Sequence, residues 1–224
     1  MTPVPIRYFS DLLCVWAYVA EVRVAAVKAA FGDQVRFEPL FCSVFGDSPR
    51  KIGAGWASKG GYPGFNNHLR EVAARFPEIE VHADLWLTVR PASSTSPHLF
   101  VKAVALAEAG GVLASGSADL AASALRRAFF HSARDISTRA VQEAVAGDLG
   151  LDLAAVRARI NDGSAFAALA GDYQEADAVG IQGGPSFVLN EGRQKLYGNV
   201  GFRVLEANIQ ELLRAPTADQ ASWC

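Results

Sequence analysis

Near the N-terminus, hydrophobic and polar positions change from a strand pattern to a helix pattern within a few residues. Residues 6–9 are rich in β-forming side chains, and the serine and aspartate that follow are typical of turns and helix starts. From Val15 onward, apolar residues recur at helical spacing until Gly32, a residue suited to end a helix. The pattern predicts a strand, a tight turn and a helix, with Cys14 in the first turn of that helix.

Three later segments also have strand character. Residues 35–41 alternate between apolar and polar side chains, and residues 186–190 and 194–198 flank a Glu191-Gly192 turn, as in a hairpin. A strand–helix–strand unit places its two strands parallel, with a right-handed crossover. We therefore expect one sheet from these three segments and the strand near residues 5–9, with the first two strands parallel and the last two a hairpin.

Between these β segments the chain is mainly helical. Residues 42–66 form an expected glycine-rich loop with aromatic side chains, for which a functional role and plain packing are equally open. Ser96 is the expected N-cap of one helix, with Pro97 at its first position. Apolar periodicity predicts helices near residues 68–76, 97–109, 118–130, 138–147, 153–160, 164–178 and 204–213.

This order of elements predicts an α/β domain that is discontinuous in sequence. The α/β domain would comprise residues 1–64 and 179–215, with an inserted all-helical domain at residues 65–178 and a tail at 216–224. The helices are expected to pack over the sheet edge that carries Cys14.

Composition narrows the classes of partner. The chain of 224 residues has a net charge of −2 and a pI near 6.1, which gives no indication of nucleic acid or an anionic membrane as a partner. Charged residues interrupt the longest apolar stretch, and the first residues do not resemble a signal peptide. Three cysteines make no disulfide framework and favour a reducing cytoplasm. The oligomeric state stays open, with a homodimer among the alternatives.

Cys14 is the main candidate for chemistry. Unpaired backbone N–H groups and the positive end of the helix dipole both stabilise a thiolate at a helix start. We therefore expect its pKa to lie below the free value of about 8.5 and Cys14 to act as a nucleophile. The alternative is a buried, unreactive cysteine. His68, His82 and His131 do not have metal-ligand spacing, and neither a metal nor a tightly bound cofactor is expected.

Three segments carry a family resemblance. Residues 11–18 read D-L-L-C-V-W-A-Y, residues 126–137 read R-R-A-F-F-H-S-A-R-D-I-S, and residues 180–190 read G-I-Q-G-G-P-S-F-V-L-N. In this order they resemble the DsbA-like thioredoxin-fold family, especially its FrnE-like cytoplasmic branch. The resemblance implies a thioredoxin-like fold with an inserted helical domain, thiol–disulfide chemistry at Cys14 and a cis peptide bond before Pro185.

The chain also departs from the pattern of that family. The family has a C-x-x-C dithiol, whereas this chain has Cys14-Val-Trp-Ala17 at that position. Alanine cannot resolve a disulfide. We therefore expect a monothiol oxidoreductase whose mixed disulfide is resolved by an external thiol, with glutathione as the candidate co-substrate. Gly184 precedes the proline and is expected to leave room for a small thiol or thiol-reactive molecule rather than a tightly held peptide.

Two other functions remain as alternatives. Related thioredoxin-fold proteins, the 2-hydroxychromene-2-carboxylate isomerases and the kappa-class glutathione transferases, resemble this chain in having a single catalytic position, usually a serine, at the same strand–helix junction. The resemblance implies a glutathione-dependent isomerase or transferase as the second hypothesis. The third hypothesis is a non-catalytic binding module.

Four further residues are candidates for the site. Trp16 and Tyr18 either line a substrate groove with Gly184 and Pro185 or belong to the apolar face of a helix. His98 is either an acid–base group facing the cleft or a surface histidine. Cys42 ends the second strand and is either a core cysteine or a secondary thiol. We expect it near the pocket wall without a bond to Cys14, since a disulfide needs Cα atoms within about 7 Å.

Overall fold

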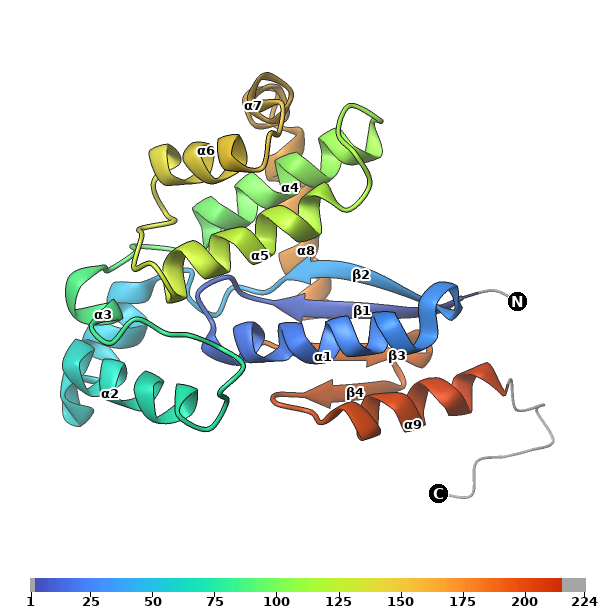
Figure 1. Ribbon diagram of the computed structural model, residues 1–224, viewed down its shortest axis with the longest axis horizontal. Coiled ribbons are helices and arrows are strands. Elements are labelled where there is room, and N and C mark those ends of the chain that lie inside the picture. Colours follow the sequence, from blue (N-terminus) through green and yellow to red (C-terminus); the bar gives the residue numbers. More distant parts are fainter. Residues whose placement is uncertain (1–2, 215–224) are drawn as a thin grey trace.

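A four-stranded mixed sheet lies at the centre of the protein, and the computed structural model describes residues 3–214 of the chain. The strand order is β2-β1-β3-β4 (Figure 1). β1 runs parallel to β2 and antiparallel to β3, and β3 pairs antiparallel with β4. The prediction of one sheet with a parallel first pair and a C-terminal hairpin is confirmed. The strands are β1 Val4–Ser10, β2 Val35–Phe41, β3 Ser186–Leu189 and β4 Gln194–Tyr197.

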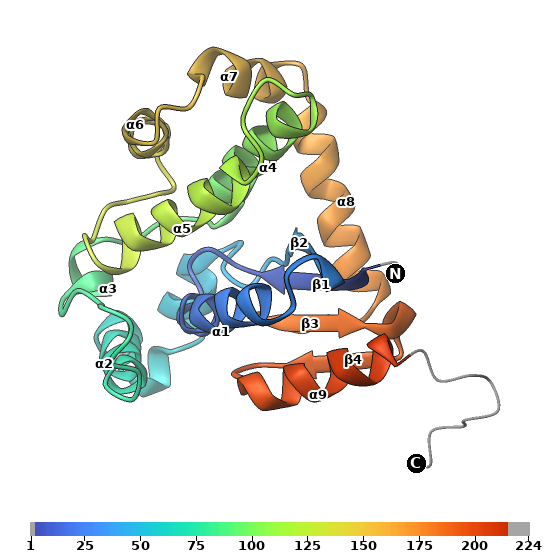
Figure 2. The ribbon, with the colours of Figure 1, turned by 45° about the vertical axis from the view of Figure 1, so that its right-hand side comes forward.

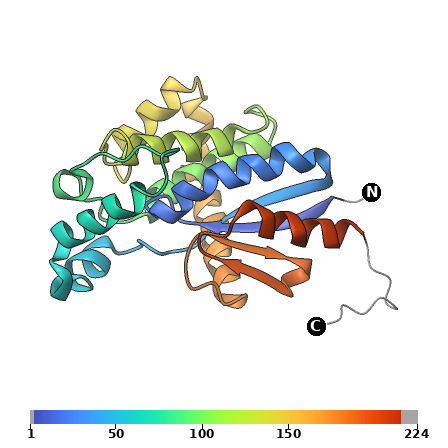
Figure 3. The same cartoon turned by 60° about the horizontal axis from the view of Figure 1, so that its bottom comes forward.

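Helices cover both faces of this sheet. α1, Val15–Phe31, and α9, Phe202–Leu213, lie side by side on one face, where they pack against Ile6 and Phe187 (Figure 3). Figure 1 shows α8, Ser164–Ala178, behind the sheet, where it packs against the side chains of Phe9 and Val188. Because successive side chains of a strand point to opposite faces, β1 contributes to both layers.

The middle of the chain is helical, as expected. α4 and α5 lie next to the sheet, and α6 and α7 lie farther out, while α8 leads back to the sheet (Figure 2). The helices before α8 are α2 Gly61–Ala73, α3 Leu85–Thr88, α4 Thr95–Ala109, α5 Ser117–Phe130, α6 Arg139–Asp148 and α7 Leu153–Asn161. Short helical turns span Gly32–Gln34, Pro49–Ala54, Ala57–Lys59 and Asn190–Gly192.

Two helix starts differ from the prediction. α2 begins at Gly61 instead of residue 68, after Gly60 adopts a left-handed conformation with φ 89°, so the expected loop over residues 42–66 is partly helical. The N-cap of α4 is Ser94 instead of Ser96.

One hydrophobic cluster connects the sheet end with the helices. It joins Leu12 and Leu13, in the turn between β1 and α1, to Trp86 of α3 and Phe129 of α5, all of which are buried. The helices therefore pack against the turn that carries Cys14, as expected.

The division into a discontinuous domain and an inserted domain stays a prediction, and the tail at 216–224 with Cys224 lies outside the described residues. Among the helices of residues 3–214, none has the length and apolar character needed to cross a membrane.

Candidate active site around Cys14

Cys14 lies where the turn after β1 meets the loop that precedes β3. It is the N-cap of α1, with extended backbone angles of φ −87° and ψ 117°, and its carbonyl oxygen accepts hydrogen bonds from the N–H groups of Ala17 and Tyr18. Its Sγ donates a hydrogen bond to the carbonyl oxygen of Gly184 at 3.2 Å. The structure therefore brings together Cys14 and Gly184, which are far apart in the sequence.

The peptide bond between Gly184 and Pro185 is cis, which confirms the prediction. A Cβ atom on Gly184 would lie 3.1 Å from the Cα of Ser10 and 3.3 Å from the Sγ of Cys42. The missing side chain would thus point into the protein. The expectation that Gly184 leaves room for a bulkier substrate is wrong, because Ser10 and Cys42 already lie beside this space.

Burial raises the pKa of the Cys14 thiol to about 11. The N–H groups of Ala17 and Trp16 lower this pKa, whereas the Asp11 carboxylate raises it, and the effect of burial is larger than any of these. The expectation of a pKa below about 8.5 is therefore wrong. A thiol that donates a hydrogen bond to a carbonyl oxygen is also in its protonated form, which disfavours the thiolate further.

Asp11 ties the Cys14 turn to two other segments. Its Oδ1 accepts a hydrogen bond from the N–H of Leu13 at 2.8 Å. Its Oδ2 accepts hydrogen bonds from the N–H groups of Val44 and Phe45 and from the hydroxyl of Ser94. Burial raises the pKa of Asp11, but His98 and the N–H groups of Phe45 and Leu13 bring it below its usual value. Asp11 is thus a buried carboxylate that fixes the loop after β2 and the start of α4 against the turn.

His98 lies beneath the same turn. It is completely buried, so it faces neither a cleft nor solvent, and both expectations for it are wrong. Its Nε2 accepts a hydrogen bond from the N–H of Leu12 at 3.1 Å, and its Nδ1 lies 3.0 Å from the Tyr173 hydroxyl. Its ring stacks on Phe41, with centroids 4.2 Å apart. These contacts make His98 a positioning residue for the turn.

Trp16 and Tyr18 turn toward the helical part of the chain. Trp16 meets Phe76 edge-on at 5.9 Å between ring centroids, and Tyr18 stacks on Phe130 at 4.8 Å. Packing accounts for both partly buried side chains, and a role in a substrate groove stays a prediction.

Cys42 is buried directly after β2, where its N–H donates to the Ser10 carbonyl oxygen. Both Cys14 and Cys42 are free in the structure, and the absence of a disulfide between them in solution stays a prediction. Burial raises the pKa of Cys42 strongly. Cys42 also lines a hollow with Tyr173 and Gly183, and Cys14 is not among the residues that line this hollow. The place of Cys42 in the wall of a substrate pocket at Cys14 stays a prediction. Its role as a secondary thiol stays a prediction.

The sequence analysis missed two buried charged residues of this region. Asp11 appeared as a turn and helix-start residue and as the first residue of the segment at 11–18, but without a role of its own, although its position three residues before Cys14 was a usable signal. Arg126 of α5 donates to the Ser10 hydroxyl and to Glu21 of α1, both at 2.8 Å. Arg126 is the first residue of the segment at 126–137, but no local pattern indicates its contacts, because its partners come from other elements. Over residues 3–214, no group of three or more histidine, cysteine, aspartate or glutamate side chains is placed to hold a metal ion.

A thiol at the start of the first helix faces the backbone before a cis-proline, beside a sheet built from a parallel pair and a hairpin. This combination defines a thioredoxin-fold protein with a helical insertion. The family model of the DSBA-like thioredoxin domain matches residues 5–210, and the chain belongs to this family.

Solved structures agree with the fold. A probable DsbA oxidoreductase from Streptomyces coelicolor superimposes with a TM-score of 0.73 at 21% identity, covering 96% of this chain and 92% of that one. The cytosolic disulfide reductase DsbM from Pseudomonas aeruginosa superimposes with a TM-score of 0.66 at 21% identity, covering 95% of this chain and 100% of that one. A 2-hydroxychromene-2-carboxylate isomerase superimposes with a TM-score of 0.64 at 16% identity, covering 97% of this chain and 100% of that one. A comparison with curated proteins finds no match.

Proposed function

We propose that the protein is a monothiol oxidoreductase that acts with glutathione or another small thiol. The observation that carries this proposal is the contact of the Cys14 Sγ with the Gly184 carbonyl oxygen beside cis-Pro185, in a site where the second thiol is missing. Ala17 stands at the position of that second thiol and is fully buried. A methyl group there cannot attack a mixed disulfide, so an external thiol has to do so.

In the proposed reaction, the Cys14 thiolate attacks one sulfur of a disulfide RS–SR′. The Cys14–SR bond forms, the S–S bond of the substrate breaks, and R′S⁻ leaves and takes up a proton. The glutathione thiolate then attacks the sulfur of the bound R group, which releases the mixed disulfide of R and glutathione and returns Cys14. One disulfide is reduced and one is formed.

The Gly184 carbonyl oxygen links substrate binding to this reaction. In the free protein it accepts the Cys14 S–H and so stabilises the neutral thiol. A substrate N–H group that takes over this oxygen removes that stabilisation, so a bound substrate favours ionisation of Cys14. Two observations support glutathione and a reducing compartment. The fold neighbour DsbM is a cytosolic disulfide reductase that has also been solved with GSH, and the three cysteines of this chain make no disulfide framework.

The raised pKa of Cys14 favours a second candidate, a glutathione-dependent isomerase or transferase. A thiol with a pKa of about 11 is neutral at pH 7 and can donate a hydrogen bond to the thiolate of bound glutathione without forming a covalent bond. The fold shared with a 2-hydroxychromene-2-carboxylate isomerase supports this candidate.

The mass of the intact protein after treatment with glutathione disulfide tests the proposal. All variants carry Cys224→Ser, so that the tail thiol does not react. We expect one glutathione adduct on the parent protein and on Cys42→Ser, and no adduct on Cys14→Ser. Without an adduct, glutathione binding in a calorimeter that survives Cys14→Ser would instead favour the isomerase or transferase. A protein that neither forms the adduct nor binds glutathione would be a binding module, and both enzymatic proposals would be wrong.

A further inference from the structure

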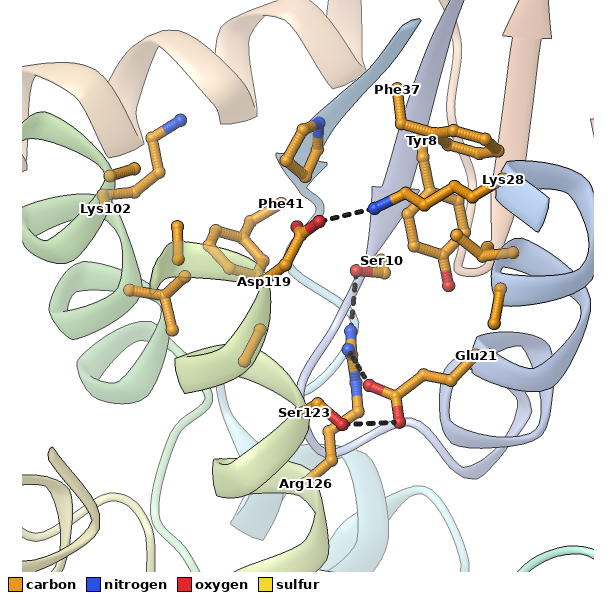
Figure 4. A pocket seen from close by; sticks show the side chains of 17 residues that line it. Tyr8, Ser10, Glu21, Lys28, Phe37, Phe41, Lys102, Asp119, Ser123 and Arg126 are labelled. Atoms are coloured by element: carbon orange, nitrogen blue, oxygen red, sulfur yellow. Dashed lines mark hydrogen bonds and ion pairs between the residues drawn. The ribbon is translucent and has the colours of Figure 1, made fainter. Parts of the chain in front are cut away.

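Arg126 of α5 is a buried cation whose partners lie in the sheet and in α1. One of its terminal nitrogens donates to the Glu21 carboxylate and the other to the Ser10 hydroxyl, both at 2.8 Å. Figure 4 shows its side chain reaching from α5 past Glu21 to Ser10, beside a cavity of about 220 Å³ between the sheet and the helices α1, α4 and α5. Because only 4% of Arg126 is exposed, water screens its charge less than that of a surface cation.

The contacts of Arg126 lead to the Cys14 site from two sides. Ser10 ends β1 and Glu21 lies in α1, so Arg126 joins the two elements between which Cys14 lies. Ser10 also packs against Gly184, since a Cβ atom on Gly184 would lie 3.1 Å from the Ser10 Cα. The Gly184 carbonyl oxygen accepts the S–H of Cys14 at 3.2 Å. The guanidinium therefore holds the residue on which the backbone partner of the thiol packs.

Two buried charges act on the Cys14 thiol with opposite signs. Burial raises its pKa most, the Asp11 carboxylate raises this pKa further, and the Arg126 guanidinium lowers it. The other titratable groups around the site are Tyr8 of β1, Cys42 after β2, His98 of α4 and Glu21 of α1. Burial raises the pKa of this phenol and of this second thiol, so both are neutral at pH 7, and the Nε2 of the imidazole accepts an N–H. The Glu21 carboxylate is thus the charge in direct contact with Arg126 that offsets it.

We propose that Arg126 is a positioning residue of the Cys14 site, that its charge stabilises a thiolate at Cys14, and that its ion pair with Glu21 limits this stabilisation. A nearby cation favours the ionised form of a thiol, and a carboxylate in contact with the cation weakens that effect. The use of this charge in catalysis rests on the function proposed for Cys14, whereas its effect on the reactivity of the thiol does not. A purely structural ion pair would hold α5 to α1 without such an effect.

The rate at which iodoacetamide alkylates Cys14 tests the proposal, followed by the mass of the Cys14 peptide in Cys224→Ser proteins. At about pH 8, well below the pKa of about 11, this rate is proportional to the fraction of thiolate. Arg126→Met removes the cation and leaves the Glu21 carboxylate, so the rate should fall about three- to tenfold. Glu21→Gln keeps a hydrogen-bond acceptor for Arg126 and removes the opposing charge, so the rate should rise about two- to fivefold. The pH midpoint of alkylation should move up in the first variant and down in the second.

The opposite signs separate an effect of charge from an effect of structure. Loss of packing would expose Cys14, lower its pKa and speed alkylation in both variants. Arg127→Met makes the same change at the next residue of α5, where the side chain is exposed, and should leave the rate unchanged. The Glu21 side chain is 25% exposed, so Glu21→Gln leaves no buried charge without solvent or a partner and remains a test if Arg126→Met does not fold.

The outcomes for this inference and for the proposed function are independent. An unchanged or faster rate in Arg126→Met, or an unchanged or slower rate in Glu21→Gln, would overturn the role of Arg126. A missing glutathione adduct would count against the proposed reaction and leave these alkylation rates as they are, because iodoacetamide needs the thiolate and no bound substrate.

Discussion

At the scale of single residues, two opposing effects act on the pKa of the Cys14 thiol. The helix start offers N–H groups that stabilise a thiolate, whereas burial penalises the charge, and burial has the larger effect. We predict that alkylation by iodoacetamide in a Cys224→Ser protein rises with pH to a midpoint near 11, with little reaction at pH 7. Cys42→Ser should give the same profile. A midpoint at or below the free value of about 8.5 would contradict this prediction.

Gly184 and Cys42 occupy neighbouring space, so substitutions at the two positions should be coupled. Gly184→Ala places a Cβ 3.3 Å from the Cys42 Sγ and should lower the free energy of unfolding by about 1–3 kcal/mol. Cys42→Ala removes that sulfur, so the double variant should lose less stability than the sum of the single variants. Denaturant unfolding of all four proteins measures the coupling. Strict additivity would show that the two side chains do not share this space.

Residue positions that depend on local sequence could be predicted, whereas their environments could not. The strand-to-turn pattern placed Cys14 at a helix start, and the resemblance around Pro185 indicated its cis bond. The pKa of Cys14 and the burial of His98 depend on helices that come much later in the chain. A rule based on the helix end alone therefore gave the wrong direction for the shift in the pKa of Cys14.

Asp11 connects three elements: the turn before α1, the loop after β2 and the start of α4. Asp11→Asn replaces an acceptor by an NH₂ group that faces other donors. We predict a loss of about 2–4 kcal/mol in the free energy of unfolding at pH 7. Asp33→Asn, an exposed aspartate on a short helical turn, is the control and should change stability little.

The same variant has a predicted pH dependence. The pKa of Asp11 is lower in the folded protein than in the unfolded chain, so its contribution is present above the unfolded value of about 3.9. This contribution to stability is lost as the pH falls through the lower pKa that Asp11 has in the folded protein. The difference in stability between the parent and Asp11→Asn should therefore shrink on acidification below about pH 4. A difference that stays constant would contradict a charged Asp11.

The helix ends show why element boundaries are harder to predict than elements. α4 begins at Thr95, and the hydroxyl of Ser94, its N-cap, donates to Asp11 instead of capping the helix. That partner is 83 residues away, so a capping rule applied to Ser96 and Pro97 could not find it. The helices themselves were predictable because their apolar periodicity is local.

At the scale of the whole molecule, one hydrophobic cluster spans the turn after β1 and the helices. We predict a single cooperative unfolding transition, because the helical residues cannot separate without exposing Leu12, Leu13 and Trp86. Far-UV circular dichroism and tryptophan fluorescence should give coincident denaturation curves, and the calorimetric and van't Hoff enthalpies should agree. Two separate transitions would show that the helical part is stable on its own.

The sheet and its helices could be predicted from the sequence, but the cavity beside α1 could not. Its lining residues come from β1, β2, α1, α4 and α5, and each is an ordinary residue of its own element. Tyr8 and Arg126 become notable only in the folded protein, where the Tyr8 hydroxyl and the Arg126 Nε have no partner, while the two other nitrogens of Arg126 donate to Glu21 and Ser10. Such a cluster follows from the arrangement of elements, which no local pattern contains.

Turnover with a small disulfide substrate tests the monothiol account most directly. In a Cys224→Ser protein, reduction of the substrate should stop at one equivalent without added thiol and continue when glutathione is supplied. Cys42→Ser should behave in the same way, and Cys14→Ser should be inactive. Turnover beyond one equivalent without glutathione, or equal rates for the parent and Cys14→Ser, would contradict the account.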